Sequence, residues 1–209
     1  MALIDAPLLN AVTIRFFNQL IFLTPQILQF LSRAERLDTI NQATVVFYDY
    51  EVVIRLSQKT ETVSHTVNHT GFSMAISCTQ SDWQLSSLAQ VCISSLPRLP
   101  TLERLEIRED RRWPPVWQDN MENGQWLELL QQFTAVKDLY LSKQVALQVA
   151  PFLQEISGET TAGVLPTLQT IFLESQVIQK ATGQFVAARQ LSGHPVAIHA
   201  WERGKEPDD

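Results

Sequence analysis

The chain has 209 residues, 45% of them hydrophobic and 18% charged, and its formal net charge is −6. These values are typical of one globular domain with a buried core, which excludes wholesale disorder. The acidic balance argues against nucleic acid as a partner, because phosphate binding requires a basic surface. No apolar run approaches the ~18 residues that a membrane span needs, so no membrane partner is expected.

The two cysteines, Cys78 and Cys92, provide neither a disulfide framework nor the spacing of metal ligands. The first seven residues lack the basic and then continuously apolar stretch of a secretory signal, and Asp5 interrupts them early. We therefore expect an intracellular protein, cytoplasmic or nuclear.

The first elements in chain order are a strand and a helix. Leu9, Val12 and Ile14 form an apolar pattern at positions one, four and six, which predicts a strand. Thr24 can cap a following helix, and Pro25 suits its first helical position.

A β-hairpin follows, because apolar residues alternate over residues 43–47 and again over 52–56, with a polar turn between the two runs. A polar connection comes next, in which residues 62–67 could form a short edge strand. A further strand is predicted over Phe72–Cys78, and a helix over Trp83–Leu96 that ends at Pro97.

The clearest signal is the six-residue pattern itself, which returns at nearly constant spacing. It occurs at Leu102–Ile107, Val136–Leu141 and Leu168–Leu173, at intervals of 34 and 32 residues. Proline or threonine precedes it each time. Such repetition is typical of a solenoid, in which each unit buries its apolar face against the next unit.

Helical patterns fill the intervals. They predict a short helix over residues 126–133, a helix over 145–156 that is kinked or divided at Pro151, and a helix between residues 176 and 190. Pro195–Trp201 predicts a last strand, and residues 202–209 a charged, frayed tail.

The expected fold is therefore α/β. Strands near residues 9, 43, 73, 102, 136, 168 and 196 would form a curved parallel sheet, with helices on its convex side and one inserted β-hairpin at about residues 43–56. We interpret residues 1–201 as a single, irregular, leucine-rich-repeat-like domain.

Several stretches of the chain carry a family resemblance. They are Phe16–Phe22, Val45–Phe47, Asp82–Cys92, Gln125–Leu130, Phe133–Leu141 and Gly183–Leu191. Together they resemble the C-terminal leucine-rich-repeat region of F-box proteins of mushroom-forming (agaricomycete) fungi. The likeness covers most of residues 7–201, and it lies in scaffold positions.

The resemblance implies a substrate receptor of a ubiquitin ligase, because the family typically begins with an F-box that docks on the ligase adaptor. No such helical module precedes the repeats here. The resemblance therefore implies the recognition half alone, and docking of a ligase adaptor is not expected of this chain by itself.

The intervening positions of each strand point away from the core, onto the concave sheet face. Tyr, Phe, Trp and Arg exposed on such a face are the usual anchors of protein recognition. The alternative is a solvated face whose charges pair across strands. The candidate partner-binding residues on this face are Arg104, Glu106, Arg108, Asp138, Tyr140, Phe172, Glu174, His199 and Trp201.

Trp113 and Trp117 flank a rigid diproline, Pro114–Pro115, and are a second candidate for partner binding. They could project as a binding loop. The alternative is that both rings fold down over the rim of the domain, because large aromatic side chains tend to be buried.

The sequence gives little support for catalysis or for metal binding. His65 and His69 stand four residues apart, but their context is β-branched and polar, and no acidic third ligand is near. Glycine-framed serine motifs and phosphate-binding glycine loops are missing from the sequence. We therefore predict no enzyme activity, no metal and no cofactor.

The prediction is a non-catalytic domain that recognises an unidentified protein partner. The alternative is an orphan structural scaffold without a specific ligand, which could self-associate through an uncapped end of the solenoid.

Overall fold

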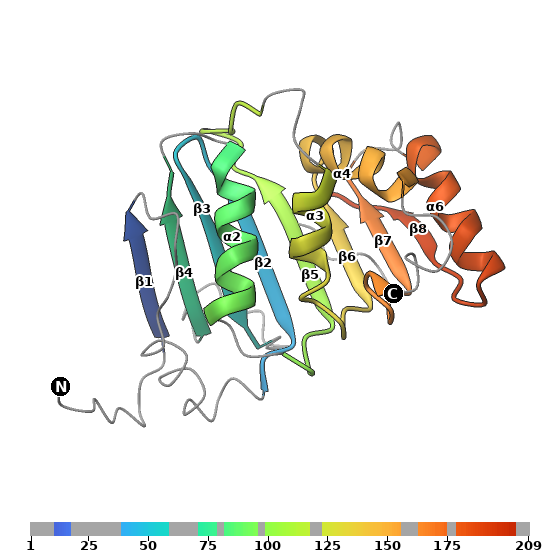
Figure 1. Ribbon diagram of the computed structural model, residues 1–209, viewed down its shortest axis with the longest axis horizontal. Coiled ribbons are helices and arrows are strands. Elements are labelled where there is room, and N and C mark those ends of the chain that lie inside the picture. Colours follow the sequence, from blue (N-terminus) through green and yellow to red (C-terminus); the bar gives the residue numbers. More distant parts are fainter. Residues whose placement is uncertain are drawn as a thin grey trace.

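The structure is a computed structural model that describes residues 11–17, 39–58, 71–78, 82–95, 99–117, 123–155, 163–174 and 179–203. In this part of the chain, strands form one sheet and helices form one layer against it (Figure 1). The strands are β1 (Ala11–Phe17), β2 (Gln42–Phe47), β3 (Glu51–Ser57), β4 (Gly71–Ser77), β5 (Arg104–Glu109), β6 (Asp138–Leu141), β7 (Thr170–Leu173) and β8 (Ala197–Ala200). The helices are α2 (Asp82–Ser95), α3 (Asn123–Leu130), α4 (Lys143–Glu155) and α6 (Gln179–Leu191).

The sheet is mostly parallel and open, with the strand order β1-β4-β3-β2-β5-β6-β7-β8. Only β3 runs against its neighbours, β2 and β4. The predicted α/β class and the predicted hairpin are therefore confirmed. The hairpin is β2–β3, and its turn is closed by the Tyr48 N–H, which donates to the Glu51 carbonyl at 2.8 Å.

The strand order differs from the sequence prediction in the first half of the chain. If the strands were added to the sheet in chain order, β4 would lie beside β5. In the structure, β2 lies beside β5 and β4 lies beyond β3. The hairpin explains the difference. Because β3 occupies one edge of β2, β4 pairs with the far edge of β3, and the other edge of β2 is left for β5.

The second half of the chain repeats one backbone arrangement at β5, β6 and β7. A turn precedes each strand, closed by the N–H of Leu102, Val136 and Leu168, which donate to the carbonyls three residues earlier. The Glu103 carbonyl then accepts the N–H groups of the two residues that enter β6, and the Lys137 carbonyl those that enter β7. The six-residue sequence pattern therefore corresponds to a repeated structural unit.

The apolar positions of that pattern all face the helices. Each of the nine is at most 2% exposed: Leu102, Leu105, Ile107, Val136, Leu139, Leu141, Leu168, Ile171 and Leu173. The core lies between them and the helix layer, where Trp126 of α3 is fully buried and packs edge-on against Phe47. Pro151 lies inside α4, which continues through it with the proline on its exposed side.

Some predictions concern residues outside the described part of the chain. These are the helix after Thr24, the edge strand over residues 62–67, the His65–His69 pair, and residues 204–209 of the predicted tail.

Arg189 of α6 ties the helix layer to the turn before β7. Its side chain is fully buried, which lowers the pKa of the guanidinium, and Nη2 lies 3.3–3.4 Å from the carbonyl oxygens of Leu165, Pro166 and Leu168. Leu165 itself has a φ of 49°, in the left-handed region that L-residues rarely adopt. The guanidinium therefore holds a strained turn in place.

Arg189→Met should lower the free energy of unfolding by about 2–3 kcal/mol, because it leaves buried carbonyls without their charged donor. Urea denaturation measures the change. Gln190→Met, at an exposed position next along α6, is the matched control and should change stability by less than about 0.5 kcal/mol. Equal effects of the two substitutions would contradict this role of Arg189.

Candidate functional site

The helices of the described residues all lie on one face of the sheet, and the opposite face over β5–β8 is the candidate site (Figure 1). Parallel pairing places Glu106, Tyr140, Phe172 and His199 in one row across these strands. A second row joins Arg104, Asp138 and Thr170. The structure thus brings together on one face most of the side chains that the sequence proposed.

Five of the side chains proposed from the sequence pack against one another in a continuous series, which we call the aromatic ladder. They are Arg104, Tyr140, Phe172, His199 and Trp201. The rings of Tyr140 and Phe172 are stacked with centroids 4.3 Å apart. The Arg104 guanidinium carbon lies 4.0 Å from the Tyr140 centroid, on the side away from Phe172 because β5 and β7 flank β6. Trp201 meets Tyr140 edge-on at 5.4 Å, and His199 lies 5.6 Å from Phe172.

The ladder is less exposed than the sequence predicted. Tyr140 is 3% and Trp201 5% exposed, so the expectation of exposed rings is wrong for these two. The reason is geometric: neighbouring strands are about 4.8 Å apart, close to the separation of stacked rings, so adjacent rings cover one another. Arg104 and Phe172 remain half-buried, and His199 is exposed.

The charges beside the ladder are neutralised along one strand. Arg108 Nε lies 3.0 Å from Glu106 Oε1, and both side chains are partly buried. Both residues belong to β5, so this ion pair does not follow the alternative prediction, in which charges pair across strands. Because Arg108 and Glu106 neutralise each other, the distinctive features of this face are the rings of the ladder and Arg104.

A polar cluster lies at the carboxyl ends of β5, β6 and β7, and it consists of Glu109, Ser142, Glu174, Arg111 and Arg203. Arg203 Nη2 lies 2.8 Å from Glu109 Oε1 and 2.9 Å from Glu174 Oε2. Ser142 donates to the other oxygen of Glu109. Arg111 lies 3.0 Å from the other oxygen of Glu174. Glu174, predicted to belong to the recognition face, is thus engaged at this edge of the sheet.

Glu174 also caps α4, because its Oε2 accepts the N–H of Lys143, the first residue of that helix, at 3.0 Å. Burial alone would raise the pKa of Glu174. The Lys143 N–H and the guanidinium groups of Arg111 and Arg203 outweigh burial, so the pKa of this carboxyl lies below its usual value. The folded protein therefore favours the ionised form.

Sequence reasoning did not single out Glu109 or Arg203. Arg203 falls in the predicted tail, and its partner Glu109 lies 94 residues earlier, so no local pattern links them. Position could have pointed to Glu109, because Glu109, Ser142 and Glu174 lie at or directly after the ends of three parallel strands.

The two tryptophans of the second candidate site have different surroundings. Trp117 packs on the core, edge-on to Phe47 at 5.6 Å. Trp113 is 67% exposed. Trp117 therefore folds down over the core, as one alternative predicts, whereas Trp113 projects from the surface, and its role in binding stays a prediction.

No family model, curated protein or solved structure matches this chain. Within the described residues, no helix is long and apolar enough to cross a membrane. In the same residues, no three His, Cys, Asp or Glu side chains are grouped so that they could hold a metal ion.

Glu174→Gln should lower the free energy of unfolding at pH 7 by about 1–2 kcal/mol, because it removes a partly buried charge from two arginines. The lowered pKa gives the sign of the pH dependence. The stabilisation is present above the pKa of an unfolded glutamate, about 4.3, and is lost as pH falls through the lower folded value. The stability difference between the two proteins should therefore begin to shrink below the unfolded value of about 4.3 and continue to shrink as pH falls further.

Denaturant titrations from pH 7 to pH 3 measure this decrease. Glu103→Gln is the control, since the Glu103–Lys137 pair is exposed on both sides and should contribute less than about 1 kcal/mol. A stability difference for Glu174→Gln that is independent of pH would contradict the assignment.

Proposed function

We propose that this protein is a non-catalytic recognition module whose helix-free face over β5–β8 binds a protein partner. The observation that carries the proposal is the aromatic ladder, a row of side chains from four neighbouring strands whose rings fix one another. Such a surface is ordered before the partner arrives, which lowers the entropy cost of binding.

The repeated unit supports a finer proposal, that residues 99–201 form leucine-rich-repeat-like units. Three turns of the same type enter β5, β6 and β7, and threonine hydroxyls reinforce the stacking: Thr101 donates to the Ile40 carbonyl and Thr167 to those of Thr134 and Val136. We accordingly propose a role similar to the substrate-receptor half of an F-box ubiquitin-ligase subunit. The strand order of β1–β4 departs from that pattern.

Recognition is favoured over chemistry because the charged groups near the face are engaged with one another. Glu106 is paired with Arg108, and Glu174 with two arginines. The accessible groups are instead the anchor types of protein interfaces: the exposed His199 and the half-buried Phe172 and Arg104. The buried Tyr140 ring packs against both Phe172 and Arg104.

A photo-crosslinking amino acid placed at His199 of the full chain tests the proposal. In an extract of the source organism it should give a discrete protein adduct, because His199 is the exposed end of the ladder. Adding Phe172→Glu should reduce that adduct at least about tenfold, since it places a charge in the centre of the interface. Mass spectrometry of the adducts provides the measurement.

The matched control carries the same crosslinker at Leu147, which is 49% exposed on α4 in the helix layer. It should not give this adduct. The same adducts from both positions, or an adduct that Phe172→Glu leaves unchanged, would overturn the proposal. Thermal unfolding of each variant verifies that the fold is retained.

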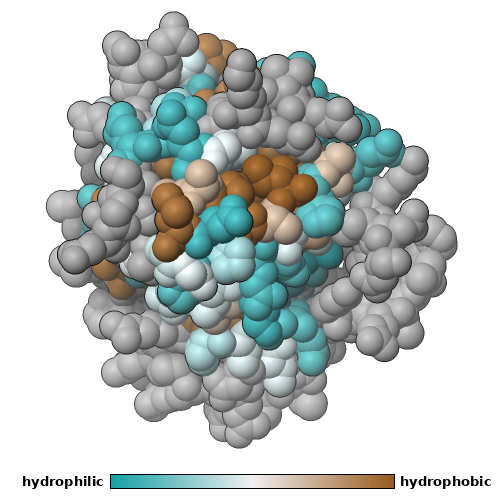
Figure 2. Space-filling view, turned by 90° about the vertical axis from the view of Figure 1, so that its right-hand side faces the viewer, coloured by the Kyte–Doolittle hydropathy of each residue, from teal (hydrophilic) through white to brown (hydrophobic). Residues whose placement is uncertain are grey.

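A second candidate is self-association through the β8 end of the sheet. Among the described residues β8 pairs only with β7, and three of its four residues are exposed. Leu191, at the end of α6, is 90% exposed. Figure 2, which faces this end, shows a hydrophobic patch near its middle. A strand edge that pairs with no further described strand, beside exposed apolar surface, favours pairing with another copy.

Sedimentation measured over a range of protein concentrations tests this candidate. The unaltered chain should show a reversible monomer–dimer equilibrium, and Leu191→Lys should shift it toward monomer by about tenfold in dissociation constant, through lost apolar burial and like-charge repulsion. Leu147→Lys should leave it unchanged. A monomer at every concentration would exclude self-association.

A further inference from the structure

A second surface of the molecule, at the carboxyl end of β5, is independent of the proposed recognition face. It is the segment Arg112–Val116, with the sequence Arg-Trp-Pro-Pro-Val. Trp113 is 67% and Val116 75% exposed, and Pro114 is exposed between them. Large apolar side chains gathered on a surface commonly mark an interaction site.

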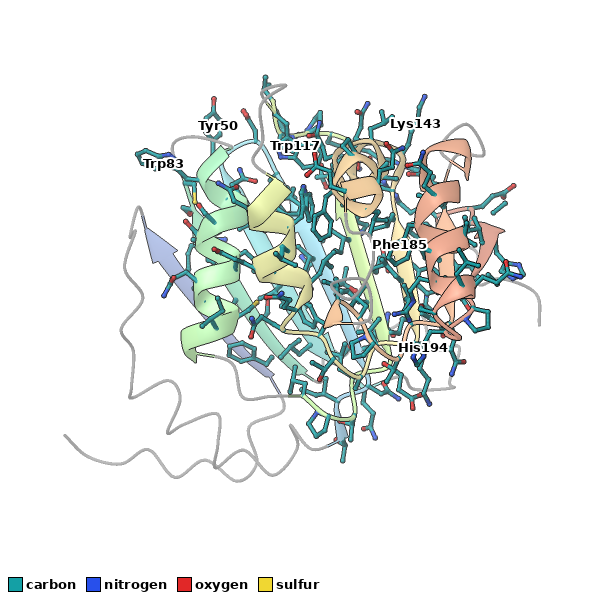
Figure 3. The ribbon with its side chains drawn as sticks, turned by 45° about the vertical axis from the view of Figure 1, so that its right-hand side comes forward. Tyr50, Trp83, Trp117, Lys143, Phe185 and His194 are labelled. Carbon is teal, nitrogen blue, oxygen red and sulfur yellow. The ribbon has the colours of Figure 1, made fainter. Side chains whose placement is uncertain are left out.

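Both ends of this segment are fixed to the body of the protein. The Asp110 N–H donates to the Phe47 carbonyl at 2.8 Å, and Asp110 Oδ1 accepts the N–H groups of Arg112 at 2.8 Å and Trp113 at 3.0 Å. At the other end, Trp117 is anchored edge-on against Phe47. Figure 3 shows Trp117 at the same end of the molecule as Tyr50 and Lys143.

The two prolines restrict the backbone between these anchors. Each proline fixes its own φ near −65°, and a residue before proline is confined to extended or polyproline II conformations. Trp113 and Pro114 each precede a proline and are therefore confined to extended conformations, directly after a bend of the backbone at residues 111–113. A ligand of this kind loses little conformational entropy when it is bound.

The charge of the segment indicates what kind of groove it fits. Arg111 is engaged by Glu174 at 3.0 Å. Arg112 is exposed, and its side chain forms no ion pair with a described residue. The exposed charge next to the prolines is thus that of Arg112, whereas the Asp110 carboxylate is occupied by the N–H groups of Arg112 and Trp113. An acidic side chain on the partner would complement Arg112.

We propose that the segment Trp113–Val116, which follows a bend of the backbone at residues 111–113, is a preformed proline-rich ligand for a partner domain with an aromatic-lined, acid-rimmed proline-recognition groove. Pro114 and Pro115 pack between the aromatic rings of that groove, Trp113 and Val116 extend the apolar contact, and Arg112 pairs with its acidic rim. The partner contacts the end of the sheet, and the helix-free face stays open to a different protein.

The test uses the full chain immobilised on a biosensor and a panel of isolated SH3, WW and EVH1 domains as probes. At least one domain class should bind at micromolar concentrations. Pro114→Ala/Pro115→Ala and Arg112→Glu should each weaken that binding by about tenfold or more, the first by freeing the backbone and the second by charge repulsion. Leu147→Ala, exposed on α4, should leave it unchanged.

Two results would overturn the proposal. One is that no domain class binds the unaltered chain, or that binding persists in both loop variants. The other is that the chain instead sediments with vesicles of phosphatidylcholine and phosphatidylserine in a manner abolished by Trp113→Ala, which would make the segment a membrane-contacting loop. Circular dichroism of each variant verifies folding, which the exposed position of the substitutions should preserve.

Discussion

The parallel register of β5 to β8 is the constraint on which the rest of the structure depends. It is set by backbone groups: the Glu103 and Lys137 carbonyls each accept two N–H groups from the chain entering the next strand. Because the register is fixed at strand entry, the chain between strands can vary in length, and helices and loops absorb the difference. Glu106, Tyr140, Phe172 and His199 therefore share one row although unequal stretches of chain separate them.

How much of this was predictable depends on the range of the interactions. The repeated pattern at Leu102, Val136 and Leu168 identified the strands and the buried side of each, because both follow from local alternation. It could not give the order β4-β3-β2, since a strand pattern such as that of residues 72–78 does not say which edge it will pair with. The same limit applies to Arg203 and Glu109, which meet across 94 residues.

Alternation also identified the face on which Tyr140 lies without predicting its burial. Whether a ring stands into solvent or lies against its neighbours depends on the residues opposite it on adjacent strands. Here Phe172 covers one side of Tyr140 and the Arg104 guanidinium the other, so the ring becomes part of a second, smaller packed layer. Such pairings depend on the relative register of strands 32 to 34 residues apart, which composition and periodicity leave open.

The charge cluster at the carboxyl ends links the two surfaces for which we propose partners. Glu174 holds Arg111, the residue before the exposed Arg112, and it also holds Arg203, two residues after Trp201 in the ladder. A partly buried carboxylate shared by two arginines ties both segments to one position at the end of β7. Movement of either segment would break its own ion pair with Glu174, since each arginine contacts a different oxygen of that carboxylate. The two surfaces therefore share one anchoring carboxylate, Glu174, at the end of β7.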